Sequence, residues 1–132
     1  MLVRDRMTSK VVTIDANRPA ADAEALLLRH RIRQLPVMRG GQLVGIITHR
    51  DLRRARAPRA TVSAVMTAKP AAIAPDAAID EAARLLRSYK VGGLPVMEGK
   101  ALVGILTVAD VLDAFIELSS RRPTRRSPRP PR

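Results

Sequence analysis

Two short segments, Thr48-His49-Arg50-Asp51 and Thr107-Val108-Ala109-Asp110, carry the residues whose types and spacing could do chemistry. Each follows an apolar, β-branched stretch and opens a run with helical spacing, which predicts a helix that begins at the threonine. The start of a helix presents unpaired backbone N–H groups and the positive end of the helix dipole, and both favour a phosphate. A threonine hydroxyl there can donate a further hydrogen bond to a phosphate oxygen. The two segments therefore predict two anion-binding sites.

The same Thr-x-x-Asp spacing also describes a helix cap that needs no ligand. A threonine at the N-cap accepts a hydrogen bond from the third helical residue, and an acid at that third position can reach back to the N-cap amide. This arrangement stabilises a helix start by about 1 kcal/mol. Aspartate is shorter than the glutamate or glutamine preferred there, so capping explains the threonine better than the aspartate. Both interpretations stay open at this point.

The chain lacks the residue sets of several other chemistries. It has no cysteine, which excludes disulfides, cysteine-ligated zinc, iron–sulfur clusters and thiol catalysis. His30 and His49 have no carboxylates at ligand spacing, so no metal site is expected. His49 either contacts a phosphate or is solvated, while His30 aligns with Tyr89 and is expected to pack on the inner side of a helix. No serine, threonine or lysine has the base partner of a nucleophile, and we predict that the protein is not an enzyme.

The elements that position the two segments occur twice in the chain, as an internal sequence repeat. A shift of 59 residues aligns about 50 positions without a gap, which indicates a tandem duplication. It places Leu35-Pro36-Val37-Met38 on Leu94-Pro95-Val96-Met97 and Leu43-Val44-Gly45-Ile46 on Leu102-Val103-Gly104-Ile105. Met7 and Met66 also align, and all four repeated methionines are expected to fill the core.

The sequence pattern of each repeat predicts secondary-structure elements in the order β-α-β-β-α. A short turn ends at Met-Thr, and an extended stretch (11–14 or 71–73) leads to a helix opened by Pro19 or by Pro75-Asp76. Two strands follow, at Leu-Pro-Val-Met and at 43–48 or 102–107, before the helix that begins at Thr-x-x-Asp. A unit of this size has little interior of its own. We therefore expect an α+β fold in which two repeats, residues 1–60 and 61–118, pack sheet to sheet with pseudo-two-fold symmetry.

Charge is distributed unevenly along the 132 residues, whose formal net charge is +12. Residues 1–60 carry 13 Lys/Arg and 5 Asp/Glu, and residues 119–132 carry six arginines and no acid. This last segment has no apolar residue besides proline and is expected to be a disordered Arg/Pro-rich tail. An alternative function is therefore polyanion or nucleic-acid binding through the tail and the first repeat. Such binding would be nonspecific, because the tail has no aromatic residue for base stacking.

No apolar run has the length of a membrane span, and no signal peptide is evident at the N-terminus. We therefore expect a cytoplasmic protein without a membrane span. The final helix carries apolar side chains at helical spacing, which favours a homodimer: Val108, Val111, Leu112, Phe115 and Ile116. A purely structural dimer with vestigial clefts is a third alternative.

The order Met-Thr, Leu-Pro-Val and Gly-Ile-Ile-Thr-His-Arg-Asp or Gly-Ile-Leu-Thr-Val-Ala-Asp resembles the CBS domain. Two such units form a CBS pair, or Bateman module, and the resemblance covers residues 3–118. It implies a stand-alone regulatory module that requires no cofactor. Such modules bind an adenosyl ligand (AMP, ADP, ATP or S-adenosylmethionine) in clefts between the paired sheets. They are usually dimers and are elsewhere fused to enzymes, channels or transporters. Because nothing is fused here, we expect a homodimer that signals to a separate regulated protein, which the sequence does not identify.

The resemblance also assigns roles to residues. Asp51 and Asp110 would accept hydrogen bonds from ribose hydroxyls, Gly45 and Gly104 would let a base or sugar approach the backbone, and Thr13 would make a polar contact. The predicted ligand-binding set is Thr13, Gly45, Thr48, His49, Arg50, Asp51, Gly104, Thr107 and Asp110.

The two predicted sites differ in charge. The first has His49 and Arg50 inside its motif, where the second has Val108 and Ala109, and Arg53 and Arg54 follow in the first helix only. The first also has Thr13 where the second has Ala72, and it has residues 32–34 (Ile-Arg-Gln) where the second has residues 91–93 (Val-Gly-Gly). We therefore expect the first site to prefer a phosphorylated ligand. The second would bind weakly, hold a less charged adenosyl compound or stay empty.

Overall fold

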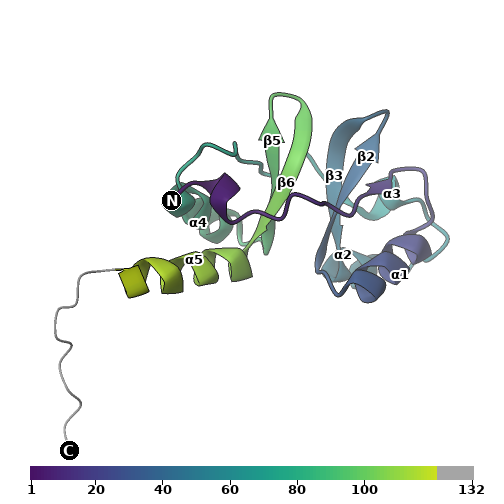
Figure 1. Cartoon of the computed structure of the whole chain (residues 1–132). Coiled ribbons are helices and arrows are strands. Elements are labelled where there is room, and N and C mark those ends of the chain that lie inside the picture. The colour runs from purple at the N-terminus through teal and green to yellow at the C-terminus, as the bar shows by residue number, and fades with distance from the viewer. Residues whose placement is uncertain (122–132) are drawn as a thin grey trace, which may run out of the picture.

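The computed structural model describes residues 1–121 and has the predicted α+β architecture of two similar halves (Figure 1). In chain order its elements are η1 (Val3–Asp5), β1 (Ile14–Asp15), α1 (Ala20–His30), β2 (Gln34–Arg39), β3 (Gln42–Thr48), α2 (His49–Ala55), α3 (Val62–Val65), β4 (Thr67–Ala68), α4 (Ile79–Tyr89), β5 (Gly93–Glu98), β6 (Ala101–Thr107) and α5 (Val108–Arg121).

The two halves contain sheets of the same topology. The first sheet has the order β1-β2-β3-β4, with β1 parallel to β2 and the other pairs antiparallel. The second consists of the antiparallel pair β5-β6, extended by single bridges from Ile73 to Val96 (parallel) and from Thr8 to Ile105 (antiparallel). Both sheets therefore follow one pattern, as the pseudo-two-fold relation of the repeats requires.

The first strand of each repeat is shorter in the structure than the sequence predicts. Of residues 11–14 only Ile14 lies in β1, and of residues 71–73 only Ile73 forms a bridge. Val11 and Val12, which precede β1, belong to no strand and line a cleft between the halves instead.

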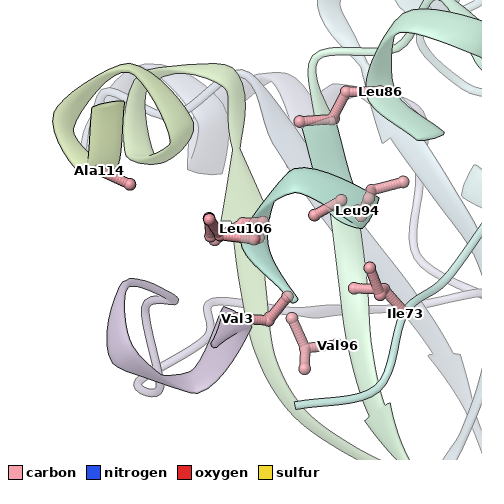
Figure 2. Packing of buried hydrophobic residues seen from close by; sticks show 9 residues of the cluster. Val3, Ile73, Leu86, Leu94, Val96, Leu106 and Ala114 are labelled. Carbon is pink, nitrogen blue, oxygen red and sulfur yellow. The ribbon is translucent and has the colours of Figure 1, made fainter. Parts of the chain in front are cut away.

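The opening segment of the chain packs on the core of the second repeat. Val3 is fully buried there, and its amide donates to the carbonyl of Ala77 over 2.9 Å. Thr8 exchanges two backbone hydrogen bonds with Ile105, of 2.9 and 3.0 Å. Figure 2 shows Val3 reaching from the N-terminal turn toward Val96 and Leu106.

The start of the second repeat makes the reciprocal contact with the first. Val62 is fully buried in the first core, and its amide donates to the carbonyl of Arg18 over 2.7 Å. β4 then pairs with β3 through Gly45 and Ile46. Residues 1–8 and 61–68 are thus exchanged between the halves, so each core is completed by the other repeat.

Both cores are aliphatic, as the composition predicts. The first contains Ile14, Ala16, Ala23, Leu27, Leu35, Val37, Ile47 and Val62, and the second Val3, Ile73, Ile79, Ala82, Leu86, Leu94, Val96, Leu106 and Ala114. Of the four repeated methionines expected to fill the core, Met7 and Met66 pack against these cores, whereas Met38 and Met97 do not belong to either cluster.

Two expectations about helix ends are wrong. His30 and Tyr89 do not pack on an inner face: both are exposed, and Tyr89 has 61% of its surface accessible. Each is the last residue of its helix, and a left-handed residue, Arg31 or Lys90, follows it and turns the chain away. Helix α4 also begins at Ile79, later than the predicted start at Pro75-Asp76.

Residues 119–121 are expected from the sequence to lie in the disordered tail, but the structure places them in a helix. Helix α5 continues to Arg121, and the hydroxyl of Ser120 donates to the carbonyl of Ile116 over 3.0 Å. The remaining tail, residues 122–132, lies outside the described residues. Within residues 1–121 no helix has the length and apolar character needed to cross a membrane.

Candidate functional site

Two clefts of similar size lie between the two halves. The first cleft has a volume of about 790 Å³ and the second about 730 Å³, within the range of small-molecule sites. The first is lined by residues that include Thr48, His49, Arg50, Asp51, Arg53, Arg54, Thr67, Lys69, Tyr89, Lys90, Gly92 and Gly93. The second is lined by residues that include Thr8, Lys10, Val11, Val12, Arg31, Ile32, Gly92, Thr107, Asp110 and Leu112. Arg33 and Gln34 line both.

Each cleft combines one repeat's helix start with loops of the other repeat. The Thr48 segment faces residues 69–71 and 89–93, and the Thr107 segment faces residues 10–12 and 31–34. The expectation that residues 32–34 serve the first site is therefore only partly right. Ile32 lines the second cleft, because the strand that follows it brings this loop toward the start of α5.

The Thr-x-x-Asp segments form capping boxes at the starts of α2 and α5. The Thr48 amide donates to Asp51 Oδ2 over 3.0 Å, and the Asp51 amide donates to Thr48 Oγ1 over 3.2 Å. The corresponding distances for Thr107 and Asp110 are 2.8 and 3.3 Å. The aspartate therefore does reach the N-cap amide, so the capping interpretation accounts for both residue types.

Capping occupies only part of each carboxylate. In the first cleft Asp51 Oδ2 also accepts from the Thr48 hydroxyl, at 3.2 Å, and Oδ1 accepts from the Thr67 hydroxyl, also at 3.2 Å. A carboxylate offers about four acceptor positions. Asp51 is half-buried and lines the cleft, so it is held in one orientation and retains capacity for a hydroxyl of a ligand. The threonine hydroxyl, in contrast, already donates to the aspartate and must turn to donate to a phosphate.

Three of the predicted site residues do not line the clefts. Thr13 is exposed and belongs to neither lining. Gly45 and Gly104 are buried under the exchanged segments. A Cβ on Gly45 would lie 2.3 Å from Met66 Sδ and 2.8 Å from the carbonyl oxygen of Thr67, and one on Gly104 would lie 2.5 Å from Met7 Sδ. These glycines let a neighbouring strand approach, which is a different role from admitting a ligand.

Positive charge is concentrated at the first cleft. Its lining contains six basic side chains and one acid, Asp51: Arg33, Arg50, Arg53, Arg54, Lys69 and Lys90. The second cleft has Lys10, Arg31 and Arg33 with Asp110.

The predicted site residues do not include four basic residues that line the clefts: Lys10, Lys69, Arg31 and Lys90. The repeat alignment pairs them two by two, and that regularity is the signal by which they could have been found. Within residues 1–121 no three His, Asp or Glu side chains gather as a metal site requires.

A comparison with protein families decides the classification. The CBS domain model matches residues 3–58 and again residues 62–117. The chain belongs to the CBS domain family. Its two CBS domains in tandem are similar to a CBS domain-containing protein of Dictyostelium discoideum, with 34% identity over 135 residues, 89% of this chain and 93% of the relative.

Other relatives carry CBS domains within longer enzymes. The inosine-5'-monophosphate dehydrogenase of Korarchaeum cryptofilum is 35% identical over 102 residues, which are 76% of this chain. The match spans only 21% of the dehydrogenase. Similarity to this relative therefore concerns its CBS part.

Solved structures share the fold over nearly the whole chain. The CBS domain pair of protein MJ0100, in complex with 5-methylthioadenosine and S-adenosyl-L-methionine, superposes with a TM-score of 0.83 at 30% identity, covering 89% of this chain and 98% of that chain. CBSX2 in complex with AMP gives a TM-score of 0.82 at 27% identity, with coverage of 89% and 98%. Both confirm the fold of a CBS pair.

Proposed function

We propose that this CBS pair is a regulatory module that binds an adenosyl ligand (AMP, ADP, ATP or S-adenosylmethionine) in its two clefts and signals to a separate protein. The observation that carries the proposal is an aspartate in each cleft, held by hydrogen bonds at the N-terminus of a helix and opposite loops of the other repeat. The adenosyl compounds held by the similar CBS pairs support it.

The composite clefts also supply a mechanism for signalling. A ligand in either cleft contacts both repeats at once, so it stabilises the relative arrangement of the repeats that fits it best. The shift of that equilibrium is limited to the difference between the ligand's affinities for the two arrangements. A partner protein that binds one arrangement would then respond to the ligand.

The different charges of the two clefts support a different ligand for each. In the first cleft Asp51 would accept from ribose hydroxyls, and Thr48, His49 and Arg50 would contact phosphate. In the second, Asp110 and Thr107 face fewer cations, which favours a less charged adenosyl compound. We carry over neither Thr13 nor the two glycines as ligand contacts, because they lie outside the cleft linings.

A thermal-shift panel of AMP, ADP, ATP and S-adenosylmethionine with the full chain tests this proposal. A ligand at 100 times its dissociation constant stabilises the folded state by about 2.7 kcal/mol. For a chain of this size the midpoint should rise by on the order of 10 °C. A shift for at least one compound that persists at high salt is the expected result. If none of the four shifts the midpoint, the adenosyl-sensing function is contradicted.

A homodimer through α5 belongs to the same proposal. Leu112, Phe115 and Ile116 on this helix are 57%, 67% and 61% exposed, and Figure 1 shows α5 projecting past the second half. Phe115→Glu is expected to convert a dimer to a monomer in light scattering, because it places a charge in the apolar face that dimerisation would bury. Leu28→Glu is the matched control, since Leu28 is 65% exposed but lies on α1. A dimer that tolerates Phe115→Glu as well as Leu28→Glu would place the interface elsewhere.

Polyanion binding is the second candidate function, favoured by the exposed arginines of α2 and the loop after it. Arg50, Arg53, Arg54, Arg56 and Arg59 are all exposed. Binding through such contacts falls steeply with salt concentration, whereas binding of an enclosed nucleotide depends on salt less strongly. Titration of inorganic polyphosphate at two salt concentrations separates the two functions. Either function fits the cytoplasm, where we propose that the protein acts.

A further inference from the structure

The two repeats differ at the residues that enter their central strands. The first repeat has Arg33-Gln34 before and at the start of β2, and the second has Gly92-Gly93 at the equivalent place before and in β5. The Gln34 side chain lies over these two glycines. A Cβ on Gly92 would lie 2.4 Å from Gln34 Nε2, and one on Gly93 would lie 3.2 Å from Gln34 Cδ. The glycines thus leave the space that the glutamine occupies.

This placement puts Gln34 between the two cleft motifs. Gln34 pairs with Thr48 in the first sheet, and Gly93 pairs with Thr107 in the second. The carbonyl of Gly92 accepts a hydrogen bond from the amide of Val108, the first residue of α5, over 3.0 Å. One side chain therefore extends from the strand pair that carries Thr48 to the strand pair that carries Thr107.

Arg33 stands beside Gln34 and also belongs to both clefts. We propose that Arg33 and Gln34 form a shared wall that couples the clefts, so that a phosphorylated ligand in the first lowers the affinity of the second for another phosphorylated ligand. This inference rests on the proposed nucleotide binding and adds its regulation. The structure gives the clefts no second copy of this wall, because its counterpart in the other repeat is Gly92-Gly93.

The physical basis is the sharing of one guanidinium. An arginine makes its strongest contact with a phosphate through two parallel hydrogen bonds, and it does so with one phosphate at a time. The first cleft has five further Lys and Arg side chains, but the second has only Lys10 and Arg31 besides Arg33. The second cleft therefore loses more when Arg33 turns to the first. The effect is reciprocal, as any coupling between two binding equilibria must be.

Isothermal titration of the full chain with AMP measures the coupling. The affinity of the second cleft is compared between the wild type, in which the first cleft fills first, and Asp51→Ala, in which the first cleft is impaired. We expect the second cleft to bind AMP at least about 5-fold more tightly in Asp51→Ala, the lower end of typical couplings. In an Arg33→Gln background this ratio should fall to about 1. A ratio of 1 in the wild-type background, or one that persists in Arg33→Gln, overturns the proposal.

Arg31→Gln is the matched control, since it removes the same charge from a residue that lines the second cleft and not the first. It should weaken the second cleft but keep the ratio. Gly92→Ala tests Gln34 separately, because the added methyl displaces the amide without changing any charge. It is expected to alter the ratio of second-cleft affinities with and without Asp51→Ala. An unchanged ratio overturns the proposed role of Gln34 in the coupling. If neither the wild type nor any variant binds AMP, the assignment of AMP to the clefts fails and the coupling with it; the proposed function fails only if ADP, ATP and S-adenosylmethionine do not bind either. Independent binding of AMP at both clefts overturns the coupling alone.

Discussion

Replacing Asp51 with alanine is expected to raise the dissociation constant of AMP for the first cleft by about 10- to 100-fold. A hydrogen bond to a charged group contributes about 1.5–3 kcal/mol, and each 1.4 kcal/mol is about a factor of ten. The carboxylate is oriented by the amide and hydroxyl of Thr48 and by the hydroxyl of Thr67, so little entropy is lost when a ribose hydroxyl donates to it. Isothermal titration of the full chain with AMP gives the two constants.

Asp110→Ala provides the control for this variant. Both substitutions break the same kind of capping box, and each should lower the free energy of unfolding by about 1 kcal/mol. Only Asp51→Ala should remove the tight AMP step, because the first cleft has more cations around the expected phosphate position. If Asp110→Ala removes the tight step and Asp51→Ala leaves it, the assignment of the two clefts is reversed.

Gly45→Ala is expected to lower the free energy of unfolding by about 3 kcal/mol, a large effect for a single methyl group. Its Cβ would meet both the sulfur of Met66 and the backbone oxygen of Thr67, at 2.3 and 2.8 Å. The methionine side chain can shift, but the oxygen belongs to β4, which is paired to β3 at Gly45 itself. Relief of the overlap therefore requires the exchanged strand to move. Urea denaturation monitored by circular dichroism measures the loss.

Gly41→Ala separates this packing effect from the general cost of replacing glycine. Gly41 has a φ of +78° in the turn between β2 and β3, and a Cβ there meets nothing within 4 Å. Its replacement should cost about 1–2 kcal/mol from backbone strain alone. Equal losses for the two variants would mean that β4 does not press on Gly45 as the structure shows.

The elements of the fold could be predicted from the sequence because their signals are local and occur twice. Helical spacing at Ala23 and Leu27 places α1, and the Leu-Pro-Val-Met segments place β2 and β5. The exchange of residues 1–8 and 61–68 could not be predicted in the same way. The two repeats have similar apolar surfaces, so Val3 and Val62 could be buried within their own repeat or in the other. Only the path of the chain in three dimensions distinguishes these arrangements.

The same limit applies to the candidate sites. Thr48, Asp51 and their counterparts were found because their chemistry lies within four consecutive residues, and the structure places them in the clefts. The lysines opposite them come from the other repeat, which no local spacing reveals. Gly45 was assigned to a ligand by resemblance, but the structure places the Met66 side chain against it.

A crystal structure of the full chain with bound AMP would show directly where the nucleotide binds. We expect AMP in the first cleft, with its ribose hydroxyls within hydrogen-bond distance of Asp51 and its phosphate beside Arg50 and the other cations of that cleft. A structure at saturating AMP in which the first cleft is empty, or in which AMP lies only on the arginines outside it, would contradict nucleotide binding in this cleft.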